Sequence, residues 1–139
     1  MSLTIGKVAK ASGLSVETIR YYEREGLLLP TGRSASGYRY YAESSVQRLR
    51  FIRRAKQLGF TLVEIRNLLV LSEGRGDQSE IKALTQDKLT IIEQRIEDLQ
   101  RMRAALQSLA ERCPGQGCID DCPIIAALND ERDLLEDAL

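Results

Sequence analysis

The chain has 139 residues, its 20 Lys and Arg balance its 20 Asp and Glu, and 43% of it is hydrophobic. This length allows one modest domain, or a small domain plus an oligomerising element. No run of about 18 apolar residues could span a membrane, and Lys7 and Lys10 interrupt the only apolar stretch near the N-terminus, so we expect a cytoplasmic protein without a signal peptide.

The charge is unevenly divided along the chain. Residues 1–60 contain eleven Lys and Arg and four Asp and Glu, a net charge of +7, whereas residues 61–139 contain nine and sixteen, a net charge of −7. A basic half is typical of a protein that binds a polyanion, and nucleic acid is the first candidate. Chance segregation of solvated charge is the alternative.

Two short helices with a tight turn between them are predicted first. Thr4 is a suitable N-cap for a helix over 5–11, which Gly13 would end in the left-handed conformation. Ser15 is a suitable N-cap for a second helix over 16–25. Helix, turn and helix in about 22 residues is the outline of a helix-turn-helix motif, although ordinary helical hairpins share it.

The second helix carries side chains that suit DNA. Arginine binds guanine edges or phosphates, and a tyrosine hydroxyl donates to phosphate, so this helix displays candidate contacts in Thr18, Arg20, Tyr21 and Tyr22. The structural alternative is that Tyr21 packs in the core and Arg20 is a solvated charge.

A hairpin is expected next, with strands over 27–29 and 38–41 and a loop rich in Gly and Ser between them. The loop contains Arg33, and Tyr38 and Arg39 follow it directly. A cation at the tip of a hairpin can reach phosphate or the minor groove. The hairpin is therefore a candidate DNA-contacting wing, and an ordinary surface hairpin is the alternative.

Two longer helices are predicted over 43–58 and 62–71, the second capped by Thr61. The first has an apolar side and a basic side, formed by Val46, Leu49, Phe51, Ile52 and Ala55 and by Arg48, Arg50, Arg53, Arg54 and Lys56. Residues 73–76 include two glycines and are expected to be a flexible link.

A single long helix is predicted over 77–112, which contains no Pro or Gly. Its apolar residues, spaced mostly by three and four, are Ile81, Leu84, Leu89, Ile92, Ile96, Leu99, Met102, Leu106 and Leu109. At about 1.5 Å per residue this helix is roughly 50 Å long. It is too long to bury its stripe in a small domain, so we expect a coiled-coil dimer.

The three cysteines, Cys113, Cys118 and Cys122, lie within ten residues of one another, and the chain has no histidine. In a cytosolic protein such a cluster indicates metal or redox chemistry more than a disulfide. Thiolate-only sites suit Cu(I), Ag(I), Au(I) and Hg(II), and less strongly Cd(II) or Pb(II), whereas zinc is disfavoured without histidine. Three unreactive thiols in a loop are the structural alternative.

Enzyme activity is not expected, because a cysteine nucleophile would need a histidine partner and no Gly-rich phosphate loop is present. A thiol redox protein or a metal buffer without DNA binding is the other class. The basic hairpin and the run Arg20-Tyr21-Tyr22 argue against that class.

Several stretches, in the same order and spacing, closely resemble the MerR family of transcription regulators over residues 2–128. They are Thr4-Ile5-Gly6, 15–23, Gly26-Leu27-Leu28, Arg33 with 37–41, 51–53 and 58–65. The resemblance implies a mainly α fold, with a winged helix-turn-helix DNA-binding domain (1–72) carrying a small β-hairpin wing, a linker (73–78), a dimerisation helix (79–112) forming an antiparallel coiled coil, an effector loop and short helix (113–128) and an acidic tail (129–139).

Family members bind as homodimers to promoters whose two polymerase-recognition elements lie too far apart. The resemblance implies that effector binding distorts this DNA and realigns the elements for RNA polymerase, which is engaged through the promoter. The DNA contacts that it implies are Thr18, Arg20, Tyr22, Arg33, Gly37, Tyr38, Arg39 and Lys56.

The cysteine loop resembles that of the metal-sensing branch, in which the first and last cysteines are the ligands. This implies Cys113 and Cys122 as ligands, with Cys118 as an extra thiol. Divalent-ion sensors carry a cysteine at the start of the long helix, contributed by the partner chain, whereas monovalent-ion sensors carry a serine. Residues 77–80 contain no cysteine, and Ser79 fits within one position. The resemblance thus favours linear two-thiolate binding of Cu(I) or a similar ion.

Two features favour other effectors. The eight residues between Cys113 and Cys122 match the spacing of mercury and zinc sensors, and Cys118 could complete a three-thiolate site for Hg(II), Cd(II) or Pb(II). Iron–sulfur relatives use four cysteines and only three are present, which leaves a thiol switch as the redox alternative.

Overall fold

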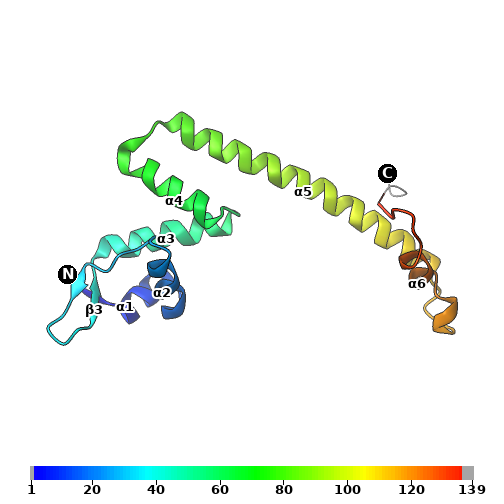
Figure 1. The fold of residues 1–139 in the computed structure, drawn as a ribbon, viewed down its shortest axis with the longest axis horizontal. Coiled ribbons are helices and arrows are strands. Elements are labelled where there is room, and N and C mark those ends of the chain that lie inside the picture. Colours follow the sequence, from blue (N-terminus) through cyan, green and yellow to red (C-terminus); the bar gives the residue numbers. More distant parts are fainter. Residues whose placement is uncertain (1, 136–139) are drawn as a thin grey trace. The chain divides into compact units, whose positions relative to one another are not determined.

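The computed structural model describes residues 2–135, apart from the side chain of residue 75. The described residues form two compact units that divide between residues 83 and 84 (Figure 1). The first unit contains strands β1 (Leu3–Thr4), β2 (Gly32–Arg33) and β3 (Arg39–Tyr41) and helices α1 (Ile5–Ser12), α2 (Val16–Arg24), α3 (Glu43–Gln57) and α4 (Leu62–Val70). Helix α5 (Gln78–Arg112) begins in the first unit and continues in the second, which also contains α6 (Pro123–Leu128). None of the described helices is long and apolar enough to cross a membrane.

The predicted helix starts are confirmed at their capping side chains. The hydroxyl of Thr4 accepts the N–H of Lys7, and the hydroxyl of Ser15 accepts the N–H of Thr18. Thr61 forms a reciprocal capping box with the residue three positions later. Each cap satisfies an N–H group that the first turn of a helix leaves without an intrahelical partner.

The three strands form one antiparallel sheet in the order β1-β3-β2, so the predicted hairpin wing is confirmed as β2 and β3. The predicted strand over 27–29 is wrong. Leu27 and Leu28 are both buried in an irregular segment, whereas successive residues of a strand point to opposite faces. Strand β1 was not predicted, because two residues are too short to show an alternating pattern.

The core of the first unit lies among its helices. The completely buried side chains include Val8, Ile19, Leu49, Ile52 and Ile65. Phe51 was predicted on the buried side of α3 but is exposed. It lies about 200° around the helix from Leu49, beyond the edge of the buried stripe that Ala55 marks.

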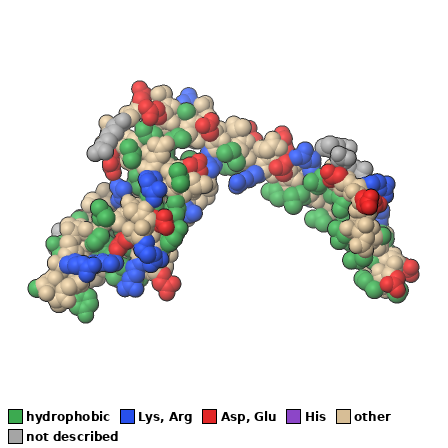
Figure 2. Space-filling view, viewed as in Figure 1, with side chains coloured by type: hydrophobic (Ala, Val, Ile, Leu, Met, Phe, Trp, Pro, Cys, Tyr) green, Lys and Arg blue, Asp and Glu red, His purple; other side chains and the backbone are tan. Residues whose placement is uncertain are grey.

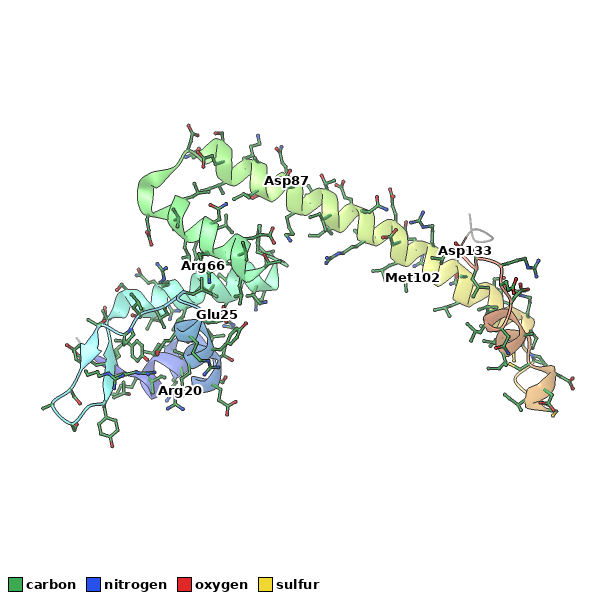
Figure 3. All side chains as sticks on the ribbon, viewed as in Figure 1. Arg20, Glu25, Arg66, Asp87, Met102 and Asp133 are labelled. Carbon is green, nitrogen blue, oxygen red and sulfur yellow. The ribbon has the colours of Figure 1, made fainter. Side chains whose placement is uncertain are left out.

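Some of the predicted basic surface is used within the fold. Arg48 donates from Nε to the carbonyl oxygen of Leu27 at 2.6 Å and from Nη1 to the carboxylate of Glu73 at 2.9 Å. Arg66 donates from Nη2 to the carbonyl oxygen of Glu25 at 2.6 Å (Figure 3). Both arginines satisfy carbonyl groups after the end of α2, and the charge of Arg48 is also matched by that of Glu73.

The predicted flexible link is more regular than expected. Leu71–Arg75 forms a π-type turn that continues from α4, and Leu71 is buried. The turn ends through Gly74, which has φ +84°, a left-handed conformation that favours glycine. The chain thus enters α5 through a structured turn.

Helix α5 agrees with the predicted helix to within one residue at its start. The carboxylate of Asp77 accepts the N–H of Ser79 at 2.9 Å, and this bond lowers the pKa of Asp77. Of the predicted apolar stripe, Leu109 is buried in the described chain, but Leu99 and Leu106 are 60% and 63% exposed. Figure 2 shows hydrophobic side chains gathered along the C-terminal part of this helix. The stripe therefore lacks the covering that its periodicity demands.

Candidate nucleic-acid interface and cysteine loop

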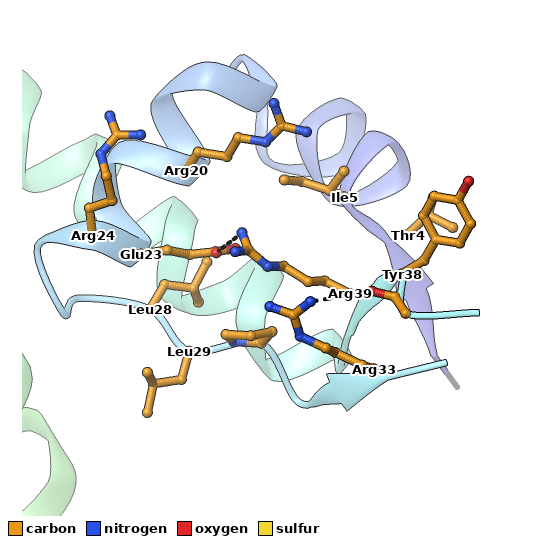
Figure 4. A pocket seen from close by; sticks show the side chains of 12 residues that line it. Thr4, Ile5, Arg20, Glu23, Arg24, Leu28, Leu29, Arg33, Tyr38 and Arg39 are labelled. Carbon is orange, nitrogen blue, oxygen red and sulfur yellow. Dashed lines mark hydrogen bonds and ion pairs between the residues drawn. The ribbon is translucent and has the colours of Figure 1, made fainter. Parts of the chain in front are cut away.

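A groove of about 730 Å³ lies between the second helix of the helix-turn-helix and the wing (Figure 4). Its lining includes Arg20, Glu23 and Arg24 from α2 and Arg33, Gly37, Tyr38 and Arg39 from the wing, together with Thr4, Ile5, Leu28, Leu29 and Pro30. The fold thus gathers five of the eight predicted DNA-contacting residues around one depression. Arg24 also lines the groove and was not predicted, although its spacing of four from Arg20 is that of one helix face.

The three predicted contacts on α2 have different environments. Arg20 is exposed, whereas the Thr18 hydroxyl shares a 2.8 Å hydrogen bond with that of Ser15 at the N-cap. Tyr22 is 6% exposed and Tyr21 is 41% exposed, so the alternative in which Tyr21 is the core tyrosine is wrong. Burial, and secondarily the nearby Tyr21, raise the pKa of Tyr22. Tyr22 therefore offers little surface to DNA.

The wing ends in a tight turn over 34–37. Gly37 has φ +88° and donates its N–H to the carbonyl oxygen of Ser34 at 2.9 Å. Arg33 lies beside this turn and donates from Nη1 to the carbonyl oxygen of Gly37 at 3.4 Å. Tyr38 is well exposed. Lys56 is also exposed, on α3, and does not line the groove.

Glu23 on α2 and two residues of β3 form a network that sequence reasoning missed. Arg39 donates from Nη1 to Oε2 of Glu23 at 2.7 Å, and the Tyr41 hydroxyl donates to Oε1 of Glu23. Burial, followed by the hydrogen bond to Glu23, raises the pKa of Tyr41 to about 12. The spacing of Glu23, three residues after Arg20, is the sequence signal that could have placed it on the same face.

Tyr41→Phe offers a test of this network by pH dependence. Because folding raises the pKa of Tyr41 from 10.0 to about 12, the neutral hydroxyl stabilises the fold fully below about pH 10, and this contribution is lost as the pH rises through about 12. Over this range we expect the free energy of unfolding to fall by about 2 kcal/mol more in the natural protein than in the variant. Urea denaturation measures both proteins, and equal pH dependence would contradict the assignment.

The cysteine loop follows α5 and leads into α6. Gly115 and Gly117 adopt positive φ angles of +75° and +110°, which turn the chain back after Cys113. A 3-10 turn over Ile119–Asp121 then ends at Cys122, the N-cap of α6. The loop thereby returns the chain so that the first and last cysteines interact.

The thiol of Cys122 has a lowered pKa. The main cause is the backbone N–H of Ile125, and the N–H of Ile124 and a hydrogen bond from the Cys113 thiol add to it, while desolvation opposes it. These donors stabilise a thiolate, which is the form that binds metals. Cys113 and Cys122 are both half-buried.

Cys118 lies in a different environment from the other two cysteines. It is exposed, and its thiol donates to the carboxylate of Asp120 at 3.7 Å. Among the described residues no three His, Cys, Asp or Glu side chains are grouped closely enough to hold a metal ion. The donors that the loop brings together are therefore two thiols, a set that fits a soft ion of low coordination number.

Comparison with known proteins finds one family over residues 3–109. Residues 3–70 match the family described as MerR HTH family regulatory protein, and residues 46–109 match the family described as MerR, DNA binding. The chain is 44% identical over 128 residues to the HTH-type transcriptional regulator CueR of Yersinia pestis, with 91% of each chain covered. It is also 44% identical over 133 residues to the mercuric resistance operon regulatory protein of Bacillus cereus, with 92% of this chain and 98% of the relative covered.

A solved structure is similar along most of the chain. It is the transcription regulator PbrR691 from Ralstonia metallidurans CH34 in complex with lead(II), which is 33% identical to this chain. The match covers 91% of this chain and 98% of the other, with a TM-score of 0.81. The similarity extends through the long helix and beyond the winged helix-turn-helix.

Proposed function

This chain belongs to the MerR family of helix-turn-helix transcription regulators, and from this premise we propose that it activates a metal-resistance promoter in response to Cu(I), Ag(I) or Au(I). The observation that carries the choice of ion is the loop that brings Cys113 and Cys122, and no third ligating side chain of the described residues, together. The family consists of transcription regulators, so the activity is binding and not catalysis.

Promoter DNA is the partner of the first unit. The groove presents the guanidinium groups of Arg20, Arg24 and Arg33 along α2 and the wing, a spacing of cations that suits phosphates and base edges. Tyr38 extends from the wing, and Lys56 supplies a further cation on α3. Thr18 and Tyr22 are expected to contribute less, because one hydroxyl serves the helix cap and the other belongs to a buried ring.

The active species is a homodimer. The exposed apolar stripe of α5 includes Ile92, Ile96, Leu99, Met102 and Leu106. A second copy of the same helix, packed antiparallel, would cover this stripe along its length, as in a coiled coil. Two DNA-binding units would then contact two half-sites of one operator.

The metal loop is the effector site. Cys113 and Cys122 would hold a soft ion through their Sγ atoms, and the bound ion would replace the thiol protons with a bond between the two ends of the loop. Hydrogen bonds from the backbone N–H groups of Ile125 and Ile124 lower the pKa of the Cys122 thiol and so favour the thiolate that binds a metal. Cys113 directly follows α5, so fixing the loop would fix the end of the helix through which the two subunits pair.

Activation requires the dimer to distort its operator. A dimer that bends and untwists an over-long spacer does work on DNA that depends on the relative placement of its two DNA-binding units. RNA polymerase would then recognise the realigned promoter, without a direct contact to this protein being needed.

A divalent soft ion is the second candidate effector. The eight-residue spacing between Cys113 and Cys122 favours it, as does similarity to a mercuric regulator and to a lead(II)-bound structure. Such an ion would need further ligands, for which Cys118 is the available thiol. Movement of Cys118 away from Asp120 would be required.

Anaerobic transcription from the protein's own promoter region tests the proposal. We expect gel shifts to show specific binding with and without metal, and Cu(I), Ag(I) or Au(I) to raise transcription at concentrations where Hg(II), Cd(II) and Pb(II) do not. Activation by the divalent ions alone would favour the second candidate. If neither the metal-free nor the metal-bound protein bound this DNA specifically, the proposed role as a transcription regulator would be refuted.

A further inference from the structure

The carboxylate of Glu23 occupies an unusual place for an acidic group. It projects from α2 into the groove that is proposed to meet DNA, and its side chain is only 9% exposed. A buried carboxylate on a surface that binds a polyanion is unfavourable unless it is paired. Its two oxygens are both used, one by Arg39 and the other by Tyr41.

The two donors come from the same side of one wing strand. Arg39 and Tyr41 are two positions apart on β3, so their side chains leave the strand on the same face. Tyr41 is completely buried, whereas the side chain of Arg39 is 40% exposed. Figure 4 shows the Arg39 guanidinium reaching across the groove to Glu23. One carboxylate therefore joins the helix and the wing through two donors.

The pairing changes what Arg39 can contribute to DNA binding. Its charge is matched by that of Glu23 at 2.7 Å, so the pair adds little net charge to the groove. The other cations of the lining are Arg20 and Arg24 on α2 and Arg33 on β2. Arg33 pairs with Arg39 in the β2–β3 register, so a shift of β3 would also displace Arg33.

We propose that Glu23 is a positioning residue that holds the wing at a fixed distance from the DNA-binding helix, and that Arg39 acts on DNA through this contact and not as an independent phosphate ligand. The proposal rests on the proposed function for its DNA partner. The negative charge of Glu23 would by itself repel DNA, so its expected contribution to binding comes from its contact with the wing.

Glu23→Gln separates positioning from simple electrostatics because the two predict opposite signs. If Arg39 bound phosphate independently, loss of the acidic charge would leave operator affinity unchanged or raise it. We expect affinity instead to fall about tenfold, the equivalent of one charge-assisted hydrogen bond. Glu25→Gln is the matched control. It removes the same charge from an exposed residue at the C-terminal end of α2 and should not weaken operator binding.

A double-mutant cycle with Arg39→Gln provides the second arm. Because both side chains act through one contact, we expect the double variant to bind operator no more weakly than either single variant. Additive losses, or tighter binding by Glu23→Gln, would overturn the proposal. Footprinting should show weaker protection under the wing, with protection under α2 retained in every variant.

Amide hydrogen exchange in the DNA-free protein tests the same contact independently of any operator. We expect Glu23→Gln to accelerate exchange at the wing amides of Ser34 and Tyr38, which are hydrogen-bonded within the hairpin, and to leave the α2 amides slow. Unchanged wing exchange would overturn the proposal. Failure of the natural protein to bind operator would refute the proposed function while this measurement still decided the role of Glu23.

Discussion

Cys122→Ser is expected to abolish metal-dependent transcription while the metal-free protein binds its operator with unchanged affinity. Cys122 interacts with Cys113 and accepts the backbone N–H groups of Ile124 and Ile125. Serine removes one of two soft ligands, so metal affinity should fall by more than about 100-fold, given that loss of an outer-shell partner alone costs about 10- to 100-fold. Competition titration with a Cu(I) chelator measures this loss.

Cys118→Ser is the matched control for that experiment. It removes a thiol from the same loop, but one that bonds to Asp120 and is not grouped with the other two. We expect its Cu(I) affinity and its transcriptional response to match those of the natural protein. A large loss of affinity in this control would instead support a three-thiolate site and a divalent effector.

Leu99→Glu is expected to disrupt the dimer and, with it, operator binding. Leu99 lies near the middle of the exposed apolar stripe of α5. A carboxylate buried without a partner in a helix–helix interface costs about 3 kcal/mol or more, which corresponds to a dimer dissociation constant raised about 100-fold. Sedimentation velocity should show a monomer at concentrations where the natural protein is dimeric.

Gln86→Glu supplies the control for the added charge. Gln86 is exposed on α5, thirteen residues before Leu99, so the helical repeat places it on the opposite side of the helix. We expect this variant to remain dimeric, to bind operator and to keep the helical content of the natural protein. A monomeric control, or a dimeric Leu99→Glu variant, would contradict pairing through the stripe.

The two predictions distinguish the role of the metal-binding loop from that of the dimerisation helix. The cysteine variant should keep DNA binding and lose the response, whereas the helix variant should lose both, because two half-sites bound by one dimer give far more affinity than a single half-site. If Leu99→Glu lost only the metal response and still bound the operator, the two subunits would have to pair through a surface other than the stripe of α5.

Features determined by local chemistry could be predicted from the sequence. Thr4, Ser15 and Thr61 cap helices because a hydroxyl at that position satisfies N–H groups one turn away, whatever the rest of the chain does. The length of α5 follows from its period and its lack of Pro and Gly. The cysteine cluster is visible as spacing alone, since the loop between its ends is short.

Features that depend on distant partners were decided only by the tertiary structure. The choice of Tyr22 over Tyr21 for the core and the irregular path of Leu27 and Leu28 reflect burial against other elements, which overrides local propensity. Arg48 looks like a surface cation in the sequence, but the carbonyl of Leu27 lies within its reach only after folding. Hydrogen-bond partners far apart in sequence are brought together by packing, and no local pattern encodes them.

Some features of the groove could likewise be predicted from the sequence, and others could not. The sequence alone determined that Arg20 and Arg33 belong to a helix and a hairpin suited to DNA, because residue type and spacing are sufficient for that inference. That Glu23 faces Arg39, sixteen residues later, was decided by the packing of β3 beside α2. A buried carboxylate needs a donor or a cation beside it, and folding, not a local motif, brings Arg39 and Tyr41 to Glu23.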